Sequence, residues 1–214
     1  MENWNKLRTL WFNKQECHRL VKDDILIFLD LETTGIPLKY NSKKFFYFEN
    51  ARVIEIAYCI TNLKGKVLCS NSYLIKGNNI TNSHVHGITN SMVLMNGINS
   101  ITGLEELIKD INEYNVTTLV CHNINFDFNV LCSEFYRHNM LLNAKRFENL
   151  KQVCTMENAG YLLKLNKYIK LIDLYNSLFD EKKIQTHRAM DDVRMCMKCF
   201  FVLKNKYGNR QHNK

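Results

Sequence analysis

Structure-breaking residues are scarce in this sequence, whose 214 residues include one proline, Pro37, and eight glycines. This scarcity argues against linkers and low-complexity stretches, and nothing in the chain repeats at a fixed period. No apolar run approaches the ~18 residues of a membrane span, so we expect no membrane partner. The N-terminus carries acids and lacks the apolar centre of a signal peptide, so we see no secretion signal.

Disulfide bonds are not expected, although the chain has eight cysteines. Most lie in apolar segments, where a free thiol behaves as a small hydrophobe, and a domain of this size needs no covalent crosslinks. We therefore predict a reducing, intracellular compartment, either the cytoplasm or, for a viral protein, the host cell. Cys196 and Cys199 have the spacing of half a zinc site, but no second pair accompanies them, and they fall within a predicted helix.

The charge balance favours a phosphate-bearing partner. The chain has 29 basic and 21 acidic residues, a net charge of +8. Basic surfaces attract nucleic-acid backbones whatever the sequence. On charge alone, a basic protein with no nucleic-acid role is an equally good interpretation.

Hydrophobic spacing predicts one α/β domain preceded by a helix. Glycine at position 65 predicts a hairpin between the second and third strands. The predicted strands cover residues 25–31, 52–61, 66–75 and 117–121. The predicted helices cover residues 1–22, 103–114, 125–140, 155–164, 170–179 and 188–207.

Acidic residues end the first predicted strand, in the segment DLETTG at residues 30–35. Alternate residues of a strand share a face, so Asp30 and Glu32 project together. Two adjacent carboxylates repel one another unless a cation neutralises them, and hard oxygen ligands suit Mg²⁺ or Mn²⁺. Taken alone, an exposed acidic strand end before a turn is the simpler explanation.

Two further segments place acids near predicted helix starts. In HNINFD, residues 122–127, Asp127 falls in the first turns of a helix that follows a buried strand. In HRAMDD, residues 187–192, a separation of five corresponds to about 140° around a helix. His187 and Asp192 can therefore reach one site only if His187 lies in the loop before the helix. The helix dipole alone also favours acids at both places.

A single reaction explains all three segments together. Four acids would gather from three separate elements: Asp30, Glu32, Asp127 and Asp192. Such a cluster is costly without cations and reasonable around two divalent ions about 4 Å apart, which can activate water and stabilise the leaving oxygen of a phosphodiester. A neutral histidine, His187, is suited to take the proton from that water.

The trio DLETTG, HNINFD and HRAMDD resembles the three exonuclease motifs of the DEDD superfamily, in its histidine-containing, DnaQ-like branch (DEDDh). The resemblance covers residues 24–205 approximately. It implies a ribonuclease H-like fold, with a five-stranded mixed sheet flanked by helices. It also implies that the catalytic metal pair, Mg²⁺ or Mn²⁺, is held directly by Asp30, Glu32 and Asp192. Asp127 would act at the second ion, and His187 would be the general base.

The resemblance extends to residues around the terminal nucleotide. Asp191 falls one place early for the family's His-x-Ala-x-x-Asp pattern, so we exclude it from the site. By motif match, the positions near the substrate are Thr33, Thr34, Glu55, Asn123 and the HGI element His86, Gly87 and Ile88.

The activity implied is 3′-to-5′ removal of nucleoside 5′-monophosphates from a free, single-stranded 3′ end. DNA is the favoured substrate. An exoribonuclease of the same family, or a proofreading subunit acting with a separate polymerase, is the alternative. A non-catalytic binding module on a decayed fold is disfavoured, because the four acids and the histidine are all present.

Two segments depart from the family pattern. Residues 38–50 form a long, basic and aromatic-rich connection, which either stacks on single-stranded bases or packs on the domain through its own aromatics. Residues 1–22 have no counterpart in the motifs. We therefore divide the chain into an N-terminal helical extension (1–22), the exonuclease domain (23–207) and a basic C-terminal tail (208–214).

Overall fold

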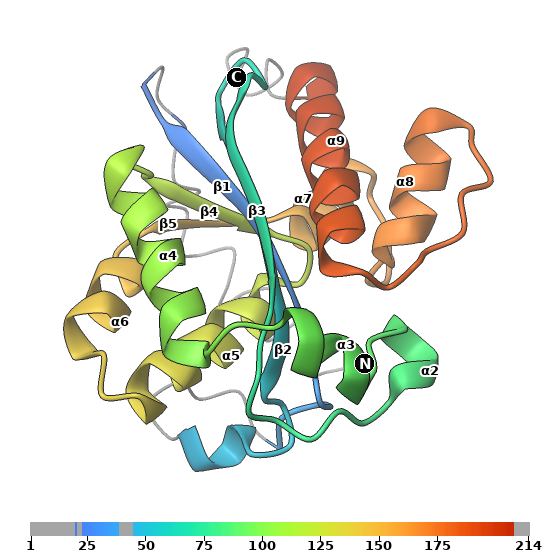
Figure 1. The fold of residues 1–214 in the computed structure, drawn as a ribbon. Helices are drawn as coiled ribbons and strands as arrows, with labels where there is room; N and C mark the ends of the chain where they lie inside the picture. The colour runs from blue at the N-terminus through green and yellow to red at the C-terminus, as the bar shows by residue number, and fades with distance from the viewer. Residues whose placement is uncertain (1–19, 21–22, 39–44, 208–214) are drawn as a thin grey trace.

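The computed structural model describes residue 20, residues 23–38 and residues 45–207 (Figure 1). The predicted N-terminal helix, apart from residue 20, lies outside the described residues. The same holds for the C-terminal tail and for residues 39–44 of the long connection.

A five-stranded mixed sheet with the order β3-β2-β1-β4-β5 runs through the centre of the molecule (Figure 1), as the family resemblance implied. The three strands β1 to β3 pair antiparallel, whereas β1, β4 and β5 run parallel. The carboxyl ends of the parallel strands therefore meet at one edge, which is where open α/β sheets bind ligands. The strands are β1 (Ile25–Thr33), β2 (Val53–Asn62), β3 (Val67–Leu74), β4 (Thr118–Cys121) and β5 (Lys151–Cys154).

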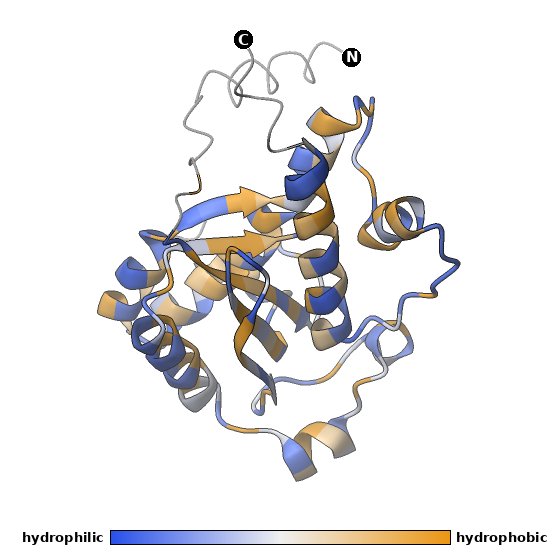
Figure 2. Ribbon diagram, turned by 90° about the horizontal axis from the view of Figure 1, so that it is seen from above, coloured by the Kyte–Doolittle hydropathy of each residue, from blue (hydrophilic) through white to orange (hydrophobic). Residues whose placement is uncertain are grey.

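Helices cover both faces of the sheet (Figure 1). One face carries α4 (Ser100–Glu113), α5 (Ile124–Arg137) and α6 (Leu141–Glu148). The other carries α7 (Thr155–Leu162), α8 (Leu171–Phe179) and α9 (Ala189–Tyr207). Figure 2 shows hydrophobic residues along the strands and hydrophilic residues on the outer sides of the helices. This is the pattern expected of a layered α/β domain.

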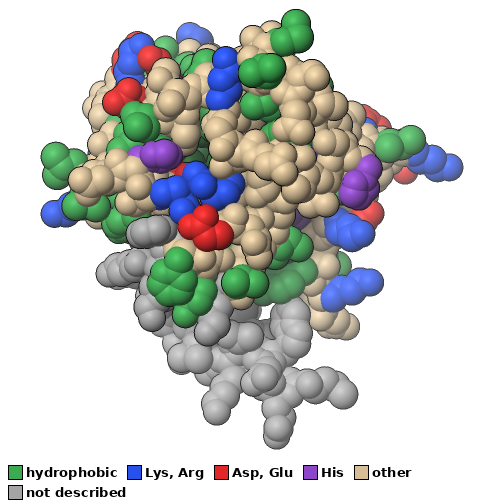
Figure 3. Space-filling model, turned by 60° about the horizontal axis from the view of Figure 1, so that its bottom comes forward, with side chains coloured by type: hydrophobic (Ala, Val, Ile, Leu, Met, Phe, Trp, Pro, Cys, Tyr) green, Lys and Arg blue, Asp and Glu red, His purple; other side chains and the backbone are tan. Residues whose placement is uncertain are grey.

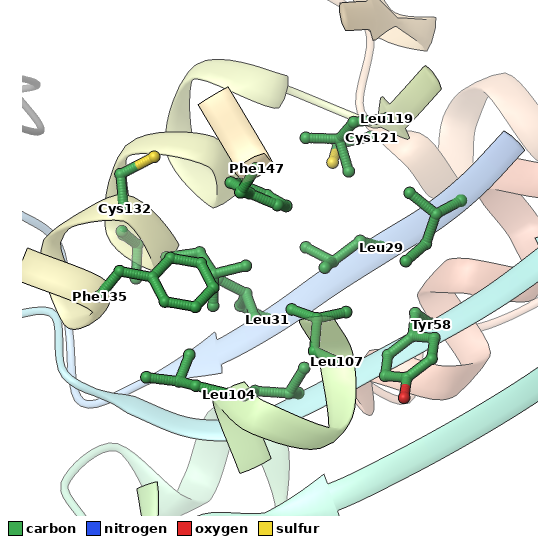
Figure 4. Close-up of a cluster of buried hydrophobic side chains, with 14 of the residues drawn as sticks. Leu29, Leu31, Tyr58, Leu104, Leu107, Leu119, Cys121, Cys132, Phe135 and Phe147 are labelled. Carbon is green, nitrogen blue, oxygen red and sulfur yellow. The ribbon is translucent and has the colours of Figure 1, made fainter. Parts of the chain in front are cut away.

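The alternation of side chains along β1 divides the core in two. Leu29 and Leu31 point into a cluster with the helices of the first face, including Leu104, Leu107 and Phe135 (Figure 4). Phe28 points to the opposite face and packs edge-on against Phe200 of α9, with ring centroids 5.3 Å apart. Even-numbered residues of β1 therefore face α9, and this side includes Asp30 and Glu32.

The β2–β3 connection is the tight turn predicted from Gly65. Its φ of +84° is accessible to glycine at little cost, and its N–H donates to the carbonyl of Asn62 at 3.0 Å. The three early strands and the long helices thus lie where expected, with ends shifted by a few residues at most.

Several short elements were not predicted. These are β5, α6, the 3₁₀ helix η1 (Phe45–Phe48), α2 (Ser83–His86) and α3 (Asn90–Asn96). Each is short and carries too little hydrophobic periodicity to be recognised from sequence.

The described cysteines are free thiols, and six of the seven are buried. Cys196 and Cys199, the pair with zinc-like spacing, belong to the core between α9 and the sheet. Across the described part of the chain, no helix has the length and apolar character needed to span a bilayer.

Candidate active site

The carboxyl end of β1 and the start of α9 bring three carboxylates together. Asp30, Glu32 and Asp192 each offer an oxygen, and these oxygens all lie within 4.8 Å of one another. Two come from alternate residues of one strand, while the third stands in the first turn of the helix that packs against that strand face. The strand alternation predicted this meeting for the first two residues.

Asp127 approaches the same place from the other side of β1. It lies in the first turn of α5 and is buried, and its Oδ1 accepts a hydrogen bond from the backbone N–H of Leu31 at 3.2 Å. Its charge raises the pKa of Asp30, so the two carboxyls are close enough to interact. The structure therefore brings all four predicted acids to one edge of the sheet.

Crowding and burial favour the protonated form of these acids. Burial, followed by the charges of the other acids, holds the pKa of Asp30 well above its usual range. The same two causes raise the pKa of Glu32 to about 8. Burial is also the largest cause of the raised pKa of Asp127 and of Asp192. A divalent cation bound among these four carboxyls would reduce the repulsion between their charges and favour their ionised forms.

The two oxygens of Asp192 differ in their hydrogen bonding. Oδ2 accepts a hydrogen bond of 2.6 Å from Nε2 of Gln185, whereas Oδ1 is buried and has no hydrogen-bond partner among the described residues. Buried carboxylate oxygens are rarely left without a partner, because their desolvation is costly. A buried carboxylate oxygen without a partner, on a residue that lies beside two other carboxylates, is compatible with a hard cation such as Mg²⁺ or Mn²⁺.

His187 lies in the loop just before α9, with Asp192 in the first helical turn, which is the arrangement that their spacing required. Its φ is +50°, an uncommon conformation outside glycine, and its side chain is exposed. Its charge lowers the pKa of Asp192, so the imidazole lies near the cluster.

Asp191, which the motif match excludes from the site, contacts two residues of its own segment. It accepts a hydrogen bond of 2.7 Å from Oγ1 of Thr186 and forms an ion pair of 3.7 Å with Arg194.

Glu55, which the motif match places near the nucleotide, lies in β2 beside the acid cluster, and its charge contributes to the raised pKa of Asp30 and of Glu32. Its carboxylate is buried in β2, opposite Glu32 in the strand register. Both oxygens accept hydrogen bonds from the guanidinium of Arg188, at 2.8 and 3.2 Å, and Oε2 also accepts from the N–H of Ala189 at 3.1 Å. Glu55 therefore joins β2 to the start of α9, and its acceptors are already used within the protein.

Arg188 and Gln185 are residues that the sequence reasoning missed. Arg188 stands inside the HRAMDD segment, and an acid in an otherwise apolar strand signals that a basic partner is needed. Nothing in the local pattern around Gln185 indicates its bond to Asp192.

The DLETTG turn is held against its neighbours. The hydroxyl of Thr33 donates to the carbonyl of Gly35 at 2.7 Å, and the hydroxyl of Thr34 accepts from the N–H of Arg52 at 3.0 Å. A Cβ on Gly35 would lie 2.6 Å from the carbonyl oxygen of Asn50, so only glycine fits there. The two threonines predicted to contact the nucleotide thus follow Glu32 directly in the chain, and their hydroxyls are bonded inside the protein.

The HGI element lies next to the DLETTG turn. The side chains of Thr81 and Asn82 both donate to the carbonyl of Thr34. His86 is buried, and its Nε2 bonds the carbonyl of Thr81 at 3.0 Å while its Nδ1 accepts from the N–H of Ile88 at 3.1 Å. Burial lowers the pKa of His86, which agrees with a neutral ring fixed between two backbone groups.

The other predicted pocket residues have structural roles. Ile88 is fully buried in a small cluster with Ile54, Ile80 and Val93. Gly87 ends α2 with a φ of +70°, and Asn123 begins α5 in the left-handed region, which asparagine tolerates better than most residues. The structure brings the HGI element and the DLETTG turn together, whereas Asn123 stands on the opposite flank, at the end of β4.

The described part of the 38–50 connection packs mainly on the domain. Phe48 is fully buried in the core, and Tyr47 packs against that core. The ring of Phe46 lies tilted against that of Tyr47, with centroids 4.3 Å apart, and Phe46 remains about half exposed. Ile36 and Leu38 are also exposed, and Figure 3 shows hydrophobic and basic side chains interspersed on the lower face of the molecule.

Comparison with known proteins gives consistent results. A family model described as RNase_T exonuclease matches residues 27–200. The exonuclease DPD1, chloroplastic/mitochondrial, of Arabidopsis thaliana is 32% identical over 195 residues, an alignment that covers 82% of this chain and 54% of that protein. The chain thus spans about half the length of this relative.

Solved structures agree with the fold. Escherichia coli exonuclease I in complex with a dT13 oligonucleotide aligns with a TM-score of 0.66 at 16% identity, covering 88% of this chain and 43% of that one. Exonuclease I from Methylocaldum szegediense aligns with a TM-score of 0.63 at 16% identity, covering 86% and 41%. At this identity the likeness supports the fold that the sequence motifs implied.

Proposed function

This chain belongs to the RNase_T exonuclease family, and from that membership we propose that it is a metal-dependent 3′-to-5′ exonuclease that releases nucleoside 5′-monophosphates. The observation that carries the proposal is the meeting of Asp30, Glu32 and Asp192 at one edge of the sheet. Asp127 lies behind them, and His187 lies in the adjoining loop.

The metal site would use the three gathered carboxylates, with the unpartnered Oδ1 of Asp192 as one ligand. Asp127 would act from behind β1, through its second oxygen or through water. When bound, divalent ions supply charge that activates water and stabilises the departing oxygen. Two ions are the number that the four acids favour.

His187 would remove the proton. A neutral imidazole nitrogen accepts a proton from the attacking water, whose oxygen then forms a bond to phosphorus. The bond between phosphorus and the 3′ oxygen breaks, and that oxygen becomes the new 3′ hydroxyl after taking a proton from solvent. The phosphate stays on the released nucleoside 5′-monophosphate. Gln185 would keep Asp192 oriented throughout, since it holds the other carboxylate oxygen.

The terminal nucleotide would enter between the DLETTG turn and the HGI element. These two segments are joined through the carbonyl of Thr34. We favour single-stranded DNA as the substrate, and the E. coli exonuclease I structures with dT13 and dA16 oligonucleotides support this choice. An exoribonuclease is the second candidate, because motifs do not report whether a 2′ hydroxyl fits.

Further proposals concern the whole chain. We place the catalytic domain at residues 23–207, with residues 1–22 as an extension that could dock on a polymerase or another replication partner. The free, mostly buried cysteines support a reducing compartment.

The test uses 5′-labelled oligonucleotides of DNA and RNA with Mg²⁺ or Mn²⁺, resolved on a gel. Each is offered with a 3′ hydroxyl and with a 3′ phosphate. A stepwise ladder from the first and resistance of the second are expected, because the pocket accepts one terminal nucleotide and leaves little room beyond it. Cleavage of a circular single strand would contradict the proposal.

A further inference from the structure

A lysine-rich and tyrosine-bearing segment connects α7 to α8. Within residues 161–170, lysines recur at every third position, Lys164, Lys167 and Lys170, and all three are exposed. Tyr161 and Tyr168 are 60% and 56% exposed, so each ring presents much of its surface to solvent. No acid lies in the sequence between positions 157 and 173. Among the described residues, none of the three lysines forms an ion pair.

The 161–170 segment is anchored beside the acid cluster. Parallel pairing aligns Phe28 of β1 with Val120 of β4, and His122 follows directly after the end of β4, at the same edge of the sheet as Asp30. Neighbouring strands are about 4.8 Å apart. Nε2 of His122 donates to the carbonyl of Ile169 at 2.9 Å, and Nδ1 of the same ring forms a hydrogen bond of 2.9 Å with the hydroxyl of Thr155. The segment therefore passes the edge of the sheet on the β4 side of the cluster.

The backbone of the segment is also fixed. Leu163 and Ile169 pack against the core under α9, and α7 and α8 both lie against α9 (Figure 1). Lys164 ends α7 with a φ of +54°, and the N–H of Leu165 returns to the carbonyl of Gly160 at 2.9 Å. Helices commonly end in this way with glycine or asparagine.

Lysine at that position is unusual within this chain. The other described non-glycine residues with positive φ are asparagine, aspartate or histidine, which tolerate it better. A lysine kept in a costly conformation, exposed and within a basic run, suggests a use for its charge.

The position of the segment relative to the nucleotide pocket suggests that use. The DLETTG turn and the HGI element lie on the β2 side of Asp30, and the 161–170 segment lies on its β4 side. Consider a nucleic-acid strand whose last nucleotide lies on the β2 side, with its scissile phosphate at the acid cluster. The rest of that nucleic-acid strand would continue across the β4 side. Single-stranded nucleic acid is bound without regard to sequence by lysines, which contact its phosphates, and by aromatic rings, which stack on its bases.

We propose that residues 161–170 bind the single strand upstream of the scissile phosphate, Lys164, Lys167 and Lys170 through its phosphates and Tyr168 by stacking on a base. This inference rests on the proposed function, because it takes the 3′ end to lie at the acid cluster. The segment would set how substrate length affects kcat/KM while leaving the chemistry unchanged.

The first experiment compares two triple variants with equal loss of charge. Lys164→Gln/Lys167→Gln/Lys170→Gln is the test, and the control is a triple variant of exposed lysines elsewhere on the surface, at Lys64, Lys66 and Lys145. Cleavage is measured on oligonucleotides of about 3 and about 20 nucleotides, which lie below and above the ~4–16 nucleotides that single-strand sites cover. The test variant should lose about tenfold or more in kcat/KM on the long substrate only, and the control should behave as wild type.

The second experiment measures binding by fluorescence anisotropy in an Asp30→Asn background, where cleavage is blocked. Each phosphate contact to a single strand contributes about 0.7 to the slope of log K against log salt, so loss of three should reduce that slope by about 2. Tyr168→Ala should weaken binding about tenfold and Tyr168→Phe should retain it, because the ring stacks and the hydroxyl does not.

Equal behaviour of the two triple variants, or a wild-type kcat/KM independent of length, would overturn the inference while the exonuclease proposal stands. Failure of every form to degrade any oligonucleotide would instead refute the proposed function. The anisotropy comparison would then decide only whether residues 161–170 bind a single strand, since it needs no turnover.

Discussion

Replacing Glu32 with glutamine should stabilise the metal-free protein while abolishing its activity. No described residue donates a hydrogen bond to this carboxylate in the structure, and burial with nearby acids raises its pKa from 4.5 to about 8. At pH 7 the folded protein must therefore keep Glu32 protonated, whereas the unfolded chain ionises it. Folding at pH 7 therefore requires Glu32 to take up a proton. At about 1.4 kcal/mol per pH unit between 4.5 and 7, this proton uptake lowers the stability of the protein by ~3 kcal/mol at most. Partial exposure of the side chain reduces the expected gain to about 1–2 kcal/mol.

The pH dependence follows from the same linkage. A raised folded-state pKa means that the native state binds more protons, so its contribution to stability is present below pH 4.5 and is lost as pH rises through about 8. The free energy of unfolding of Glu32→Gln should therefore rise steadily relative to that of wild type between pH 5 and pH 8. Saturating Mn²⁺ should reverse the order, because the ion stabilises wild type by about 2.7 kcal/mol at a hundred times its Kd.

The assay is urea denaturation with a chelator and then with Mn²⁺, at several pH values. Glu105→Gln, on the exposed side of α4, is the control and should leave stability unchanged. A Glu32→Gln variant less stable than wild type in chelator would show that the carboxylate makes stabilising contacts, and the reasoning would be refuted.

Three other predictions concern the start of α9. Asp192→Asn should lower turnover at least about a hundredfold and Asp191→Asn should be tolerated, as measured by release of labelled nucleotide; the reverse order would mean that the wrong aspartate faces the site. His187→Ala should reduce kcat by roughly 10² to 10⁴ and leave metal binding intact by calorimetry, whereas collapse of metal binding would make His187 a ligand. Arg188→Met should cost about 1–3 kcal/mol in urea denaturation, because it leaves the buried carboxylate of Glu55 without its cation. Adding Glu55→Gln to that variant should recover most of the loss, and simply additive losses would show that the two side chains do not act as a pair.

The acid cluster could be predicted because local rules determine most of it. Strand alternation places Asp30 and Glu32 on one face, and helical geometry requires His187 to precede the helix that carries Asp192. The structure agrees on each point. Such rules act over a few residues, so one sequence is enough to apply them.

The partners of buried groups could not be predicted, because they depend on contacts far apart in the chain. Glu55 and Arg188 are 133 positions apart, and only the folded sheet brings them together. Arg188 therefore could not be identified from the sequence as the partner of Glu55.

Strand β5 was missed for a similar reason. Its four residues, KQVC, contain little that marks a strand, and they become one by pairing in parallel with β4. Tertiary context decides such short segments. The 38–50 connection left two readings open from sequence, and burial of Phe48 shows that its described part packs on the domain.

The most direct test of the central claim is mass spectrometry of the products formed in heavy-oxygen water. A single-stranded oligonucleotide with a 3′ hydroxyl is digested with Mg²⁺ by wild type and by Asp30→Asn. If water attacks phosphorus at the acid cluster, wild type should release nucleoside 5′-monophosphates with the heavy oxygen on phosphate, and the variant should release almost none. Release of nucleoside 3′-monophosphates, or equal release by both proteins, would contradict the account.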